Sequence, residues 1–283
     1  MTAVEVTVPR RSRGAEWSAL AALFGLTVRQ HTHGRRMFVL GALYLLPCAL
    51  ALVLRNLSRP APAEALEFAL VFTLLPHGLA PLTALLYAAG VVSDEVEEQT
   101  LTYLLVRSVP RWLLYITKLF ATWCVTTVLV AFAVFILYAA IYSGSPEFGS
   151  TIFPRALRAI ALSALAQVGY CALFGFLGLY TRWSLVAGIA YIVAIEGVLA
   201  NLDFVGRSLT VVYYVRTLSL DWLGLPTELD RQCREVWRMR DQTLLPTSTN
   251  SVLTLLGFGL VVTLLSSLWF ARSEYRVKTP GGD

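Results

Sequence analysis

Charged residues are scarce in this sequence. Only 14% of its 283 residues are charged, 57% are hydrophobic, and the mean hydropathy is +0.65. Soluble domains carry about 25% charged residues, so the composition excludes an ordinary soluble domain and indicates a membrane protein. Lysine is nearly absent, since only Lys118 and Lys278 occur and the other basic residues are arginines. These lie mostly in short connectors rather than on one basic face, so nucleic acid is not expected as a partner.

Motifs for ATP hydrolysis and for common enzyme chemistry are also missing. A phosphate-binding loop needs glycine amides, a lysine and a hydroxyl in the order G-x-x-x-x-G-K-[ST]. Lys118 is followed by Leu119, and Lys278 lacks the preceding glycines. Neither H-E-x-x-H nor G-x-S-x-G occurs, which argues against a zinc protease or a serine nucleophile. We therefore expect no catalytic residue and no cofactor in this chain.

Only four cysteines are present, and none of them pairs with another at a spacing typical of a zinc site. Cys48, Cys124 and Cys171 fall inside apolar runs, where a free cysteine is usually a small buried apolar residue. Cys233 stands alone in a polar segment. His31 and His33 have no acidic or cysteine partner at ligand spacing, so they predict headgroup contacts rather than a metal site.

Long apolar runs are what the sequence does contain. A helix needs about 20 mostly apolar residues to cross a bilayer. The second run is longer than a bilayer requires, and Pro76 and Pro81 inside it are candidate kink points. Arg182 and Trp183 alone separate the fourth and fifth runs, which predicts a tight hairpin with a cationic tip. Six runs qualify as spans: Met37–Leu54, Phe68–Val92, Trp112–Tyr142, Ala156–Thr181, Ser184–Ala200 and Ser251–Phe270.

Basic residues predict the orientation of these spans. Six arginines precede the first span and two follow it before the second, and the side richer in Lys and Arg is usually cytoplasmic. An even number of spans puts both termini on that side. The chain begins without the basic start and cleavage site of a secretory signal, so we expect the N-terminus to be retained. These features predict a multi-pass protein of the cell (inner) membrane with both termini in the cytoplasm.

The regions outside the spans have their own patterns. In 1–36, a cytoplasmic N-terminal tail, apolar residues at helical spacing predict an amphipathic helix, either in the headgroup plane or packed on the protein's own cytoplasmic side. The segment 201–250 is predicted to lie outside, partly re-entrant and with a small solvated helix, because its first half is rich in Tyr and Trp. The residues 272–283 form a cytoplasmic tail. The apolar stripe of the first helix is Trp17, Leu20, Phe24 and Val28.

Four carboxylates interrupt the apolar pattern between the second and third spans. Ser93 and Asp94 are good helix caps, and acids in the first turn suit the positive end of a helix dipole. We therefore predict a cytoplasmic helix over 94–106 with a leucine stripe and an anionic face. From the residues alone, this helix is either a contact surface or a solvated loop helix whose acids only serve as caps. Its acids and leucines are Asp94, Glu95, Glu97, Glu98, Leu101, Leu104 and Leu105.

The stretch E-V-E-E-Q-T-L-T-Y-L-L-V-R-S-V-P-R-W, which begins at Glu95, resembles a cytoplasmic segment of type-2 ABC exporter permeases. It departs from the family pattern at Gln99, where a glycine is usual, and at Ser108 and Pro110, where proline and serine are exchanged. The motif covers about a tenth of the chain, but six spans, an amphipathic lead-in helix and a long outer segment before the last span are also similar. The matching positions are Glu95, Glu97, Thr100, Leu101, Leu104, Leu105, Val109, Arg111 and Lys118.

The resemblance implies that the helix over 94–106 is a coupling helix that docks on a separate ATP-binding subunit. It also implies that ATP and magnesium are held by that partner, and that a second permease subunit completes a dimer, expected to be a homodimer. The small residues Gly169, Ala172, Gly175 and Gly178 of the fourth span offer a close-packing face for such a seam or for neighbouring helices. The implied contact set for the ATPase is Glu95, Glu97, Glu98, Thr100, Leu101, Leu104, Leu105 and Arg111.

Two polar residues within the apolar runs are candidates for a substrate path. Glu196 lies near the end of the fifth span, where a carboxylate is either functional or an interfacial acid paired with an outer arginine. His77 lies mid-span between Pro76 and Gly78, where it either faces a path or bonds across helices.

The sequence thus predicts an all-α membrane protein with a six-span domain over 37–271. We expect it to be the permease subunit of an ABC exporter that works in the lipid bilayer with a separate ATPase. The alternatives are a membrane enzyme that uses His77 and Glu196, and a non-transporting membrane partner of an ATPase.

Overall fold

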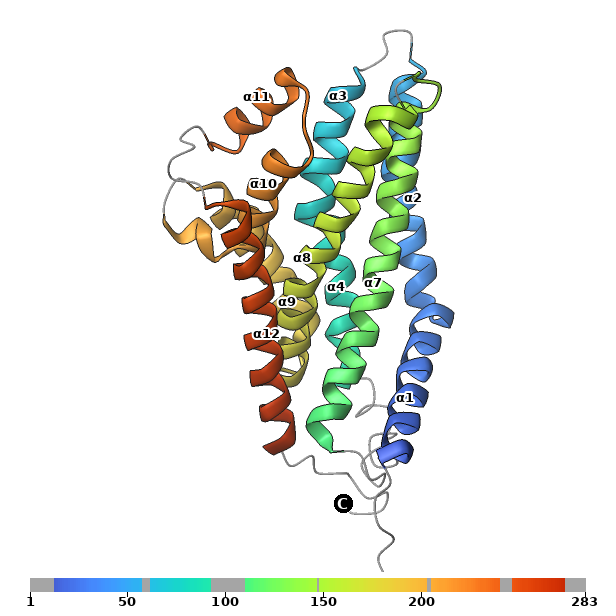
Figure 1. Ribbon diagram of the computed structural model, residues 1–283, viewed down its shortest axis with the longest axis vertical. Helices are drawn as coiled ribbons and strands as arrows, with labels where there is room; N and C mark the ends of the chain where they lie inside the picture. Colours follow the sequence, from blue (N-terminus) through green and yellow to red (C-terminus); the bar gives the residue numbers. More distant parts are fainter. Residues whose placement is uncertain are drawn as a thin grey trace, which may run out of the picture.

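The computed structural model describes residues 13–57, 62–92, 110–146, 148–202, 205–239 and 246–272. These residues form helices and no strands (Figure 1). Six helical stretches are long and apolar enough to cross a bilayer, which indicates a multi-pass membrane protein. Each predicted run falls on one of them. They are Arg35–Arg55, Ala63–Val92, Arg111–Tyr142, Phe148–Tyr180, Ser184–Asn201 and Ser248–Arg272.

Several of these stretches are built from more than one element. The first and third spans are the single helices α2 (Arg35–Arg55) and α7 (Arg111–Tyr142), and the sixth is α12 (Ser248–Arg272). The second span consists of α3 (Ala63–Leu66), η1 (Glu67–Leu79) and α4 (Ala80–Ala88). The fourth joins η2 (Phe148–Ile152) to α8 (Phe153–Tyr180). The fifth joins α9 (Ser184–Tyr191), η3 (Ile192–Val198) and η4 (Leu199–Asn201).

The prolines of the second span lie where its helix type changes. Pro76 lies inside η1, a π-helix of 13 residues, and Pro81 lies at the start of α4, which continues directly from η1. The span also begins earlier than predicted, at Ala63 rather than Phe68. π-helical turns widen a helix locally and are frequent at functional sites. Two ionisable residues, Glu67 and His77, lie on this stretch, and Glu196 lies on another π-helix, η3.

The core of the bundle lies around α8, which packs against α4, α7, α9, α10 and α12. Small residues permit this close packing. A Cβ on Gly178 would lie 2.2 Å from the carbonyl oxygen of Ala89, and one on Gly175 would lie 2.8 Å from the hydroxyl of Tyr115. Gly175 and Gly178 of the fourth span therefore pack closely against other helices of the same chain. Packing against neighbouring helices is one of the two roles predicted for these small residues.

The N-terminal helix α1 (Arg13–His33) packs along α7 (Figure 1). Leu23 and Thr27 are buried, and the rings of Phe24 and Phe120 lie 6.0 Å apart. Trp17, placed on the apolar stripe by the sequence, is 73% exposed. The contact face is therefore shifted from the predicted stripe. The contact face of α1 is covered by α7 of the same chain, which agrees with the predicted alternative of a helix packed on the protein itself.

The segment after the fifth span turns back onto the bundle. It contains η5 (Val205–Leu209), α10 (Val211–Trp222) and α11 (Thr227–Val236), and α10 packs between α8 and α12. The helix α11, predicted to be solvated, buries Leu229 and Cys233 on one face. Burial raises the pKa of the Cys233 thiol to about 12. In Figure 1, α11 and α3 lie at the end of the bundle opposite α1.

Candidate functional site

The predicted ATPase contact set falls almost entirely outside the described residues. This applies to Glu95, Glu97, Glu98, Thr100, Leu101, Leu104 and Leu105, and to the coupling helix over 94–106. Arg111, the last member of the set, is the first residue of α7. The flanking residues come together, because the ammonium of Lys118 donates to the carbonyl oxygen of Val91 over 3.2 Å. The roles of these residues stay a prediction.

His77 contacts an arginine that the sequence analysis did not single out. The carbonyl oxygen of Thr73 lies 2.8 Å from Nδ1 of His77, and because a carbonyl only accepts, Nδ1 carries the proton. The other ring nitrogen, Nε2, then accepts from the guanidinium of Arg216. His77 thus bonds across elements, which is one of the two roles predicted for it, and its imidazole is partly exposed.

Arg216 is the centre of the arrangement that we call the Arg216 cluster: His77, Glu196, Asn201, Arg216 and Trp237. Its guanidinium donates to the carbonyl oxygen of Ala200 at 3.1 Å and to Oδ1 of Asn201 at 2.8 Å. It also lies 5.5 Å from the ring centroid of Trp237, in a cation–π contact. The residue is 3% exposed, and burial lowers its pKa to about 10, so it stays charged at neutral pH.

Glu196 is fully buried and serves as a cap for α10. Its two carboxylate oxygens accept from the backbone N–H groups of Val211 and Val212, at 3.1 and 3.0 Å. The next N–H, that of Tyr213, donates to the side chain of Thr210. A helix leaves its first N–H groups without internal partners, and a carboxylate there also meets the positive end of the dipole. Among described residues, Glu196 forms no direct ion pair with an arginine, contrary to the interfacial alternative.

A small cavity borders the Arg216 cluster. It has a volume of about 30 Å³ and is lined mainly by apolar side chains, together with Arg216, Ser163 and Ser219. A volume of this size accommodates one or two water molecules and no larger ligand. A substrate path at this place would therefore need the spans to move apart.

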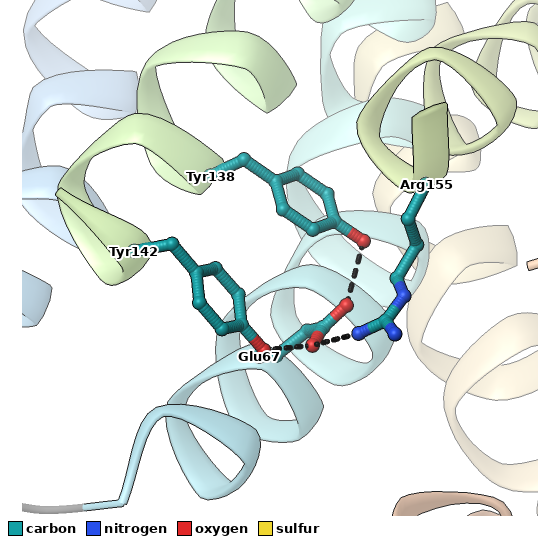
Figure 2. Close-up of polar contacts among 4 residues, drawn as sticks. All are labelled: Glu67, Tyr138, Tyr142 and Arg155. Carbon is teal, nitrogen blue, oxygen red and sulfur yellow. Dashed lines mark hydrogen bonds and ion pairs between the residues drawn. The ribbon is translucent and has the colours of Figure 1, made fainter. Parts of the chain in front are cut away.

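A second buried polar group, the Glu67 cluster, joins three spans (Figure 2). Its members are Glu67 of η1, Tyr138 and Tyr142 of α7, and Arg155 of α8. The guanidinium of Arg155 lies 3.2 Å from Oε2 of Glu67, and the hydroxyl of Tyr138 donates to Oε1 at 2.8 Å. Tyr142 donates to Oε2. Glu67 is fully buried and Arg155 is 5% exposed, so the opposite charges neutralise each other away from water.

The sequence analysis missed the Glu67 cluster. Glu67 stands one residue before the predicted start of the second span, and Arg155 one residue before that of the fourth, so both lie outside the predicted spans. One signal was present, because Tyr138 and Tyr142 are four residues apart and share a helix face. Nothing in the sequence, however, pairs that face with Glu67, which lies 71 positions before Tyr138 and 75 before Tyr142.

Comparison with known protein families matches residues 42–215, more than half of the chain, to DUF2705, which is described as a protein of unknown function. The chain belongs to the DUF2705 family. The matched region begins in α2 and ends in α10, so it contains Glu67, His77, Arg155 and Glu196. The family description assigns no activity to these residues. A search of curated proteins found no match to this chain.

Proposed function

We propose that this protein is the membrane-spanning subunit of an ABC exporter, which works as a dimer with two separate ATP-binding subunits. The observation that carries the proposal is the acidic, leucine-rich segment that follows Glu95, which resembles the coupling segment of type-2 ABC exporter permeases. Its place in the chain supports the proposal, because it lies between the second and third of six membrane-long helices.

The arrangement of the neighbouring elements adds support. Val91 and Lys118, which flank the acidic segment, are in contact, and the hydroxyl of Tyr87 donates to the carbonyl oxygen of His31 at the end of α1. The described residues that flank the segment therefore lie beside α1, at the end of the bundle opposite α11 (Figure 1). A docking element for a cytoplasmic ATPase has to lie at the cytoplasmic end of the helix bundle. In our proposal this is the end beside α1, because six arginines precede the first span.

In this proposal the chain resides in the cell (inner) membrane with both termini in the cytoplasm. The acidic helix transmits closure of the ATPase pair to the second and third spans. Faces of the second and fifth spans, with His77 and Glu196, would line the path for an unidentified substrate. Because the cavity at Arg216 is only about 30 Å³, transport through it would require the second and fourth spans, which line it, to separate from α10.

The membrane-enzyme alternative finds less support in the geometry. A general acid or base must reach a proton on a substrate. Both oxygens of Glu196 accept from backbone N–H groups of α10, and the proton-free nitrogen of His77 faces the cation of Arg216. These contacts give both side chains a role in holding α10. A non-transporting partner of an ATPase remains the second candidate, because it would use the same docking segment.

The test is co-purification with a candidate ATP-binding subunit, first any that is encoded beside this gene, followed by ATPase and transport assays in vesicles. We expect Leu104→Asp to weaken association more than tenfold, because a charge would replace an apolar contact residue, and Glu97→Lys to weaken it less. Glu235→Lys is the control, because it makes the same charge change on exposed α11. Unchanged association and ATPase activity in both docking variants would refute the proposal. Intact ATPase coupling without cargo movement would favour the non-transporting partner.

A further inference from the structure

A basic pocket lies where α1 meets α2 and the second and third spans. Its volume is about 390 Å³, which falls within the range typical of ligand sites. None of the described residues that line it is acidic. Five of them carry a positive charge or acquire one on protonation: His31, His33, Arg35, Arg36 and Lys118.

Hydrogen bonds to neighbouring helices hold three of the five basic side chains in place. The guanidinium of Arg36 donates to the carbonyl oxygen of Leu86, and the ammonium of Lys118 donates to that of Val91. The ring of His31 bonds the hydroxyl of Thr122 at 2.9 Å. Lys118 is only 4% exposed although it carries a charge. The pocket thus combines basic side chains of three helices, α1, α2 and α7, in which Lys118 is buried and Arg35 and Arg36 are exposed.

The position of the pocket along the first span is informative. Arg35 and Arg36 are the first residues of α2, and the apolar part of that span begins directly after them. Phe38 is 77% exposed and Val39 is 61% exposed, so the surface next to the pocket is apolar and faces outward. A charged hollow that continues into an outward apolar face matches an amphiphile, with an anionic head and hydrocarbon tails, better than it matches a free anion.

We propose that this pocket binds the phosphate of an anionic phospholipid, with the acyl chains lying along the exposed face of α2. Arginine suits this role because its planar guanidinium pairs with two phosphate oxygens at once. Basic pockets between membrane helices on the cytoplasmic side are known to hold anionic headgroups. The inference does not depend on the ABC assignment. One bound lipid would contact α1, α2 and the first turns of α7.

The experiment uses the full-length protein in detergent, with native mass spectrometry and thermal unfolding after addition of phosphatidylglycerol, phosphatidylcholine or inorganic phosphate. We expect phosphatidylglycerol to be retained and to raise the unfolding temperature, and phosphatidylcholine to do neither. Each cation removed should weaken binding about fivefold, so Arg35→Gln with Arg36→Gln should weaken it on the order of 20-fold. Replacing both by lysine should restore most of the binding.

Arg182→Gln is the matched control, because Arg182 is exposed in the α8–α9 connection and does not line the pocket. If the double variant unfolds without lipid, Arg35→Gln alone serves in its place. Equal retention of the two lipids, or equal loss in the Arg182 control, would overturn the proposal. Stabilisation by inorganic phosphate that equals the effect of phosphatidylglycerol would show a free phosphate site and overturn the lipid assignment.

Discussion

The Glu67 cluster and the Arg216 cluster both bury charge in the same half of the bundle, but they neutralise it in different ways. In the Glu67 cluster, a carboxylate and a guanidinium form a direct ion pair, and two tyrosine hydroxyls donate hydrogen bonds to the same carboxylate. In the second, Arg216 donates to a carbonyl, an amide and an imidazole, while the nearby carboxylate of Glu196 accepts from backbone N–H groups.

This difference indicates two mechanical roles. The Glu67 cluster connects the second, third and fourth spans with one ion pair, and losing either partner would strand a buried charge. The Arg216 cluster connects α10 to the second and fifth spans through several weaker bonds, each of which can be replaced separately. We therefore expect the first to fix the bundle and the second to set how firmly α10 is held.

Removal of the charge on Glu67 should have the largest effect. In Glu67→Gln, Arg155 would be buried without a counter-charge, so we expect a loss of about 3–5 kcal/mol in the free energy of unfolding. Reversible unfolding in mixed micelles measures this loss. Glu64→Gln, an exposed carboxylate nearby, should change stability by less than about 0.5 kcal/mol.

A double variant sharpens this prediction. Adding Arg155→Met to Glu67→Gln removes the stranded cation, and should recover most of the lost stability. If Glu67→Gln alone were as stable as Glu64→Gln, the ion pair would not fix the bundle, and the contrast between the clusters would fail.

Exchange of Arg216 for lysine should have an intermediate effect. A lysine ammonium is a compact charge and cannot reproduce the planar contacts to Ala200, Asn201, His77 and Trp237. We expect a loss of about 1.5–3 kcal/mol, together with faster hydrogen exchange in α10 than in the spans. Arg231→Lys on the exposed face of α11 is the control. Uniformly faster exchange throughout the bundle would place Arg216 in the same role as Glu67.

Glu196→Gln should have the smallest effect of the three. The amide oxygen still accepts one of the two backbone bonds, but the charge that favours the helix N-terminus is lost. The expected loss is about 1 kcal/mol, seen as roughly fivefold faster exchange of the Val211 and Val212 amides. Glu228→Gln, in the first turn of the more exposed α11, should cost only a few tenths of that. An effect as large as that of Glu67→Gln would contradict a capping role.

The spans were the most predictable part of the protein, because about 20 apolar residues have few alternatives to a membrane-crossing helix. All six predicted runs fall on membrane-long helices.

The polar clusters were less predictable. His77 and Glu196 were recognised as costly in an apolar run. Arg155 and Arg216 lie outside the predicted spans, and composition alone does not show which connectors fold back onto the bundle. The buried face of α1 also differs from the predicted apolar stripe, because its packing against α7 decides which face is covered.

By itself, the sequence determined the class of protein, the number of spans and the absence of a phosphate-binding loop, since these follow from local composition and contiguous motifs. Only the tertiary structure decided that Glu67 pairs with Arg155, that Glu196 caps α10, and that five basic side chains surround one pocket. The first two contacts join residues 88 and 15 or 16 positions apart, and the third brings Lys118 to basic residues of the segment 31–36. Helix packing, rather than any local pattern, brings these distant residues together.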